Sequence, residues 1–213
     1  MAANIGEIRA DVRKDLHDED SAAYRWTDAV LDRHIQRAVA EYSLHNPREQ
    51  KSTLTTSANS RDVGIASLID LIEIVQVEWP TGEFPPRLVG FTKWQTTITM
   101  DVVAPPTGTE NVNIWWLRAH ELAAGTSTIP AIHDDIICAG AAAYAALDWT
   151  SYATNRLNTG GEDVWGRYKA FAAERLAYFT QELQRLSIRN RVRQRRLYTT
   201  EAPSIFEQSR VKY

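Results

Sequence analysis

The 213-residue chain has one cysteine, no long apolar run and no segment built like a signal peptide. The single cysteine, Cys138, excludes an intramolecular disulfide framework, and structural zinc sites usually gather several thiolates. No stretch approaches the roughly 18 apolar residues of a membrane span. The segment 1–20 is acidic and amphipathic rather than positively charged and apolar. We therefore expect a non-membrane protein that is made and kept in a cytoplasm.

Catalytic constellations are also lacking. Gly160-Gly161 has neither the lysine nor the preceding strand of a phosphate-binding loop. The histidines at positions 34, 45 and 120 have no serine or cysteine partner that spacing identifies. Carboxylate pairs could be drawn among 27 acidic residues, but the sequence does not establish the spatial separation of the two carboxyl groups that glycoside cleavage requires. The sequence predicts no enzyme and no cofactor.

Two clusters contain metal-ligand types but have simpler interpretations. His133-Asp134-Asp135 precedes Cys138 by one helical turn, and acids at a helix start complement the helix dipole. Cys138 itself is interpreted as a buried, inert thiol. The acidic run at 17–20 lacks the glycine and the bidentate glutamate of a calcium loop, so we interpret it as a solvated helix end. No metal site is predicted.

Charge is distributed unevenly along the chain. Residues 1–163 hold 23 acids and 13 bases, a net charge of −10, whereas residues 164–213 hold 4 acids and 11 bases, a net charge of +7. Such polarity suits a molecule that meets copies of itself or another acidic surface, and it would also suit nucleic acid.

Apolar periodicity predicts four helices and three strands. The helices are expected at about 4–17, 28–45, 130–155 and 162–193, with Asn4 and Glu7 forming a capping box and Thr27 an N-cap. Strands are expected at about 71–79, 94–103 and 111–118, and residues 51–67 are interpreted as turns with at most one short strand. The last two strands are predicted to pair as a β-hairpin. Its projecting tip would contain Pro105, Pro106, Thr107 and Gly108.

The predicted fold is α+β and mainly helical: a helical bundle of about four helices with a small antiparallel sheet. Residues 1–196 would form a single domain, and residues 197–213 an extended C-terminal tail.

The helix at 162–193 carries one apolar stripe. Asn190 interrupts this stripe, so we expect the helix to leave its packing partner there. The stripe consists of Trp165, Tyr168, Ala172, Leu176, Phe179, Leu183 and Leu186.

Arginines dominate the end of this helix and have three possible uses. Arg185, Arg189, Arg193 and Arg196 follow steps of four, four and three residues, which aligns them on one helix face. They could contact phosphates, pair with an acidic neighbour or form a solvated helix end favoured by the dipole. The acidic body of the chain favours the second use.

The tail at 197–213 has no clear period, and Pro203 argues against a continued helix. It nevertheless contains more apolar anchors than a disordered tail needs. We expect it to become ordered on a partner. The anchors are Leu197, Tyr198, Ile205, Phe206, Val211 and Tyr213.

The order of segments resembles the head–tail adaptor, or connector, proteins of tailed bacteriophages. The resemblance covers most of the chain, to about Arg196, and contains no chemical signature. It rests on the amphipathic first helix, Tyr24-Arg25-Trp26-Thr27-Asp28, Glu41-Tyr42, Ile74-Val75-Gln76-Val77-Glu78-Trp79-Pro80, the hairpin, the helix start at 126–130 and the alanine-rich helix at 138–147.

This resemblance implies a non-enzymatic virion protein at the capsid–tail junction, present in the host cytoplasm during assembly. It would form a homo-oligomeric ring, commonly of twelve subunits, under the portal protein, with double-stranded DNA passing through the lumen. The C-terminal segment, from Arg189 through Arg193 and Arg196 to Tyr213, would dock on the portal. The Pro105-Pro106 tip would contact a neighbouring subunit or the next ring, and a stopper, completion or tail protein would bind the opposite face.

Two other functions remain open from the sequence. One is a DNA-binding protein that uses the arginine stripe. The other is a peptidoglycan hydrolase of the phage neck.

Overall fold

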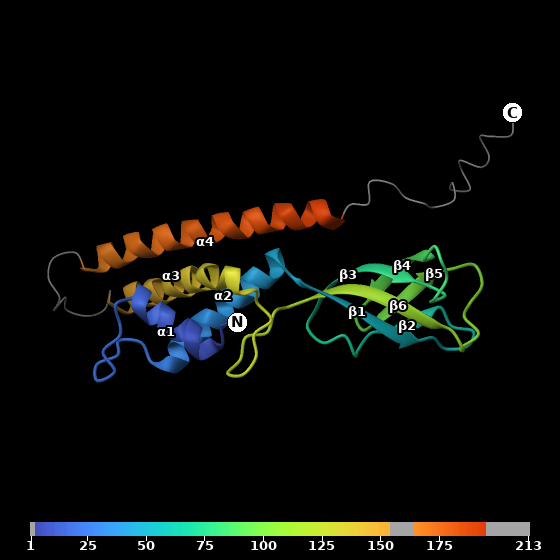
Figure 1. The fold of residues 1–213 in the computed structure, drawn as a ribbon, viewed down its shortest axis with the longest axis horizontal. Helices are drawn as coiled ribbons and strands as arrows, with labels where there is room; N and C mark the ends of the chain where they lie inside the picture. Colours follow the sequence, from blue (N-terminus) through green and yellow to red (C-terminus); the bar gives the residue numbers. More distant parts are fainter. Residues whose placement is uncertain (1–2, 154–163, 195–213) are drawn as a thin grey trace, which may run out of the picture.

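The structure is a computed structural model that describes residues 3–153 and 164–194. Figure 1 shows the helices gathered at one end of the molecule and the strands at the other, with α4 lying along the upper side of α3. The predicted α+β class is confirmed. The helices are α1 (Ile5–Asp15), α2 (Asp28–His45), α3 (Asp134–Ala153) and α4 (Val164–Gln194), with a 3₁₀ turn η1 (Ala131–His133) before α3. The strands are β1 (Arg48–Thr55), β2 (Asp62–Gly64), β3 (Leu71–Glu78), β4 (Leu88–Trp94), β5 (Thr97–Asp101) and β6 (Asn111–Arg118).

The sheet is larger than predicted and is inserted between α2 and α3. Its six strands pair antiparallel in the order β1-β6-β3-β4-β5-β2. β1 and β2 stand at opposite ends of this order, yet only residues 56–61 join them. Because six residues span at most about 20 Å, the sheet must curl back on itself. It encloses its own apolar core, which includes Val77, Ile98 and Ile114. We call this part the sheet module.

The predicted hairpin between 94–103 and 111–118 is wrong. β5 pairs with β4 and β2, whereas β6 pairs with β1 and β3. The alternating pattern located β6 correctly and overlapped β5, although the predicted start at residue 94 lies in β4. Alternation does not specify the pairing partner. Residues 88–101 instead fold as the hairpin β4–β5, which turns at Gln95 with a φ of 44°.

The segment 51–67, interpreted as turns with at most one short strand, contains residues 51–55 of β1 and all of β2. β1 is an edge strand in which half-buried and exposed residues alternate. Both faces of β1 carry mainly polar side chains, so no apolar alternation marked this strand in the sequence.

The helical module consists of α1 to α4 and has a separate core. α3 lies at its centre, in contact with the other three helices, and its small residues let α4 approach closely. Gly140 faces Phe179 of α4, and both are buried. The predicted capping box of Asn4 and Glu7 is present at α1, and Thr27 caps α2. Within the described residues, no helix is long and apolar enough to cross a membrane.

The acidic run after α1 is not simply a solvated helix end. Asp18 is buried and its carboxylate accepts hydrogen bonds from Arg13 (2.7 Å) and from the backbone N–H of Arg25 (2.7 Å). Arg13 also binds Asp28 at the start of α2 (2.7 Å). Asp18 and Arg13 therefore fix the turn between α1 and α2. Glu19 is exposed, as predicted.

Candidate docking surfaces

The apolar stripe predicted for α4 forms most of its contact with α3. Ala172, Phe179, Leu183 and Leu186 are buried, and Tyr168 and Leu176 are half-buried against the same core. Trp165 is the exception, with 53% of its surface exposed. α4 is therefore a packed element over five turns rather than a free rod.

Asn190 extends this packing instead of ending it. Its side-chain nitrogen donates to the backbone oxygen of His45 (3.1 Å) and to Oδ1 of Asn46 (2.9 Å), at the C-terminal end of α2. The expectation that α4 leaves its packing partner at Asn190 is wrong. A polar residue in an apolar stripe can bind an unpaired helix C-terminus, and this is what Asn190 does.

Asn190 thereby joins a polar cluster between the helical and sheet modules. Asn46 Nδ2 donates to the Tyr42 hydroxyl, which shares a hydrogen bond of 2.6 Å with Nδ1 of His133. His120, two residues after the end of β6, contacts the backbone oxygen of Asn46 through Nε2 (3.0 Å). We call these five residues the joint. It ties α2, α4, η1 and the return from β6 to one point.

Burial governs the ionisation of the joint. It raises the pKa of Tyr42 to about 12. It lowers the pKa of His120 and of His133, in the latter case with help from the positive charge of Arg189. Both imidazoles are therefore held neutral near pH 7, which suits their role as hydrogen-bonding partners.

The structure describes the side chains of two of the predicted arginines near the end of α4. Arg185 and Arg189 are exposed, and Arg185 lies 3.5 Å from Glu182 on the same helix. Arg193 lies within α4, but its side chain is outside the described part of the structure. Arg196, Leu197, Tyr198, Ile205, Phe206 and Tyr213 also lie outside the described residues, so their docking role stays a prediction.

The segment with Pro105, Pro106, Thr107 and Gly108 is a connection between β5 and β6 rather than a hairpin tip. Pro106 is buried, and its backbone oxygen accepts from the N–H of Asn59 (2.9 Å). Gly108 has a φ of 90°, and a methyl group there would lie 2.8 Å from the backbone nitrogen of Ala58. The segment is thus packed against residues 56–59. Its contact with another subunit stays a prediction.

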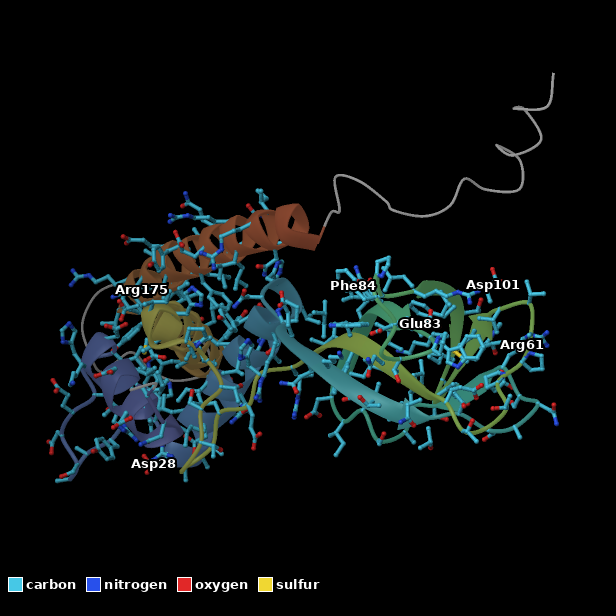
Figure 2. The ribbon with its side chains drawn as sticks, turned by 45° about the vertical axis from the view of Figure 1, so that its right-hand side comes forward. Asp28, Arg61, Glu83, Phe84, Asp101 and Arg175 are labelled. Carbon is cyan, nitrogen blue, oxygen red and sulfur yellow. The ribbon has the colours of Figure 1, made fainter. Side chains whose placement is uncertain are left out.

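A projecting loop does exist between β3 and β4, outside the contact surfaces predicted from the sequence. Phe84 at its tip is 98% exposed, beside Glu83. The base is closed by a hydrogen bond from the N–H of Trp79 to the oxygen of Arg87 (3.1 Å). Figure 2 shows Phe84 on the upper side of the sheet module, the side on which α4 lies in the helical module. An aromatic residue between glycine and two prolines could have identified this anchor.

The possible metal ligands are not brought together. Among the described residues, no group of three or more histidine, cysteine, aspartate or glutamate side chains could hold a metal ion. Cys138 is buried, and burial raises the pKa of its thiol to about 12, as expected of an inert thiol. Asp134 accepts a hydrogen bond from the backbone N–H of Ala3 (3.3 Å), so it links α3 to the N-terminal end of α1.

The chain belongs to the SU10 adaptor protein family, whose family model matches residues 3–203. The resemblance to head–tail adaptors is thereby confirmed.

Two solved structures have chains similar to this one. One is described as the neck of an empty GTA particle computed with C6 symmetry, with 14% identity, 82% of this chain and 88% of that chain covered, and a TM-score of 0.31. The other is described as the neck of a native GTA particle computed with C12 symmetry, with 15% identity, 82% and 92% covered, and a TM-score of 0.29. No curated protein matches the chain.

Proposed function

We propose that this chain is a structural virion protein that forms a ring under the portal and joins the DNA-filled capsid to the tail. Membership of the adaptor family supports this role. In this proposal double-stranded DNA passes through the ring without sequence recognition. The portal binds one face, and a stopper, completion or tail protein binds the other.

The proposed docking of the C-terminal tail on the portal is supported by the contacts that fix α4 to the rest of the helical module. Phe179 anchors its middle on α3, and Asn190 anchors its last turns on α2. The described part of α4 extends four residues further, to Gln194. The residues that follow, with their apolar anchors, are thus delivered from a fixed point of the fold. A fixed starting point reduces the entropy that the tail loses when it binds.

Deletion of residues 197–213 tests this docking role. Because the packed part of α4 ends before the deletion, the truncated chain should keep its helical circular dichroism and its midpoint of unfolding. It should lose binding to purified portal rings, measured by sedimentation. A matched control replaces Thr199 and Thr200 by serine and should bind as the full chain does. Unchanged binding by the truncated chain would refute tail docking.

DNA binding is the second candidate, and the charge of α4 favours it. The helix carries seven bases and two acids, a net charge of +5. Phosphate contacts predict retention on duplex DNA that falls steeply with salt and is lost when Arg189, Arg193 and Arg196 are replaced together. Retention on portal rings with no retention on DNA would favour the adaptor role. Zymography on peptidoglycan tests the hydrolase alternative.

A further inference from the structure

A broad hollow lies between α1 and the segment that leads from the sheet to α3. Its volume is about 980 Å³, and residues 121–128 form one wall while the exposed face of α1 forms the other. Small residues, Ala3, Ala10 and Ala124, leave it open. Its volume lies at the upper end of the roughly 300–1,000 Å³ of typical ligand clefts, so it can accommodate several side chains of a partner.

The hollow and its rim are crowded with carboxylates. Glu7, Asp11 and Glu121 line it, and Asp134 adjoins it through its hydrogen bond to Ala3. Burial raises the pKa of Asp134, and the negative charges of Asp135, Asp11 and Glu7 raise it further. These carboxylates therefore repel one another. A cationic partner in the hollow would relieve this repulsion.

The basic residues of the hollow neutralise its negative charge only in part. Lys14 and Arg48 are among its lining residues, and Lys14 is engaged by Asp11 at 2.8 Å. Because the lining holds three acids and two bases, its net charge is −1, and Asp134 and Asp135 make the neighbourhood more negative. A phosphate backbone is therefore a poor occupant.

The outward face of α4 has the opposite charge. Arg185 and Arg189 project from its C-terminal half, on either side of Ile188, which is 63% exposed. The described acids of this helix are Glu174 and Glu182, and Glu182 faces Arg185. Arginine is enriched at protein interfaces, and the core of an interface is apolar.

The hollow and this face of α4 lie on opposite sides of the helical module. Figures 1 and 2 both show α4 along the upper side, with α1 and the loop before α3 below it. A closed ring requires a heterologous contact, in which one surface of each subunit meets a different surface of the next. Two complementary surfaces on opposite sides satisfy this requirement, whereas two surfaces on the same side would not.

We propose that the C-terminal half of α4 from one copy lies in the hollow between α1 and residues 121–128 of the next copy. Arg185 and Arg189 then face Asp11 and Glu121 of the neighbour, and Ile188 contacts the alanines. This inference rests on the proposed function, because it names the two surfaces that close the ring.

Charge reversal on each side tests the contact in the full-length chain. One variant, D11R/E121R, reverses the hollow, and another, R185E/R189E, reverses the helix. Glu7 is left intact because it caps α1. Each variant alone should fail to form rings, or should need at least about tenfold more protein, since like charges placed together cost several kcal/mol and about 1.4 kcal/mol is tenfold. Electron microscopy and native mass spectrometry would count the rings, with and without portal.

Mixing the two variants is the decisive experiment. In an alternating ring, each reversed hollow meets a reversed helix and each native hollow meets a native helix. Rings should therefore return in the equimolar mixture, and this recovery would also show that both variants fold. The control R87E/K93E makes the same change in net charge as R185E/R189E, but at exposed residues of the sheet module. It should assemble normally.

Three results separate the claims. Normal rings from either variant alone would overturn the proposed contact while leaving the ring itself standing. Failure of the mixture to recover rings, with native circular dichroism for both variants, would also overturn the contact. Absence of rings from the unmodified chain, alone and with portal, would overturn the proposed function together with this inference.

Discussion

The close approach of α3 and α4 at Gly140 can be tested by adding a single methyl group. A Cβ atom placed on Gly140 would lie 2.9 Å from Cε2 and 3.0 Å from Cδ2 of Phe179. Phe179 is fully buried, so its ring has little room to move. Gly140→Ala should therefore push α4 away from α3 or distort the ring.

Two opposing terms set the size of the effect. Replacing glycine by alanine inside a helix stabilises by about 1 kcal/mol. Overpacking a filled core costs about 1–3 kcal/mol. The sum is a loss of about 0–2 kcal/mol in the free energy of unfolding. In a Phe179→Leu background the ring is gone, so the same Gly140→Ala change should become stabilising by about 1 kcal/mol.

Urea unfolding followed by circular dichroism at 222 nm measures all four members of this cycle. The coupling between the two positions should be about 1–3 kcal/mol, as for residues in direct contact. A Gly140→Ala variant that gains about 1 kcal/mol in both backgrounds, following helix propensity alone, would refute the tight packing of α4 on α3.

Three further predictions concern Asn190 of the joint, the buried histidines and the exposed β3–β4 loop. Asn190→Ala should lower the free energy of unfolding by about 1–3 kcal/mol, because it removes hydrogen bonds at the end of α2. Hydrogen exchange should also rise in the last turns of α4. The control Gln184→Ala, on the exposed face, should change neither quantity. Burial lowers the pKa of His34, His120 and His133. Below about pH 6.5 the unfolded chain therefore binds more protons than the folded chain, and the free energy of unfolding should fall. An unfolding midpoint that does not drop between pH 7.5 and 5.5 would contradict this. Phe84→Ser should leave the free energy of unfolding within about 0.5 kcal/mol but weaken assembly with a neighbouring virion protein, measured by co-sedimentation.

The helices were predictable because their periodic patterns and caps are local. The starts of α1 and α2 follow from Asn4 and Thr27, and the structure confirms both caps. The packing stripe of α4 was also predicted, apart from the exposed Trp165. These features depend on residues within a few turns of one another, which a sequence displays directly.

Strand pairing and polar contacts could not be predicted in the same way. β5 and β6 follow one another in sequence but pair with other strands, because sheet order depends on contacts that alternation does not encode. Asn190 looked like the end of a packing stripe because its partner, Asn46, is 144 residues away. Asp18 looked solvated because Arg13 and Arg25 bind it only after the chain turns.

The docking residues show a similar limit. Arg189 was selected by charge and helical spacing, and the anchors in the tail by composition. Phe84 was not selected, because a loop sequence does not reveal how exposed its side chain will be. Its exposure follows from the closure of the β3–β4 loop at Trp79 and Arg87.

The adaptor role can be tested by electron microscopy of the full-length chain mixed with purified portal rings. An adaptor should form a second ring, coaxial with the portal and attached on one side, with an open lumen wide enough for duplex DNA. Portal rings without an added layer, under conditions in which the chain is folded, would contradict the adaptor role.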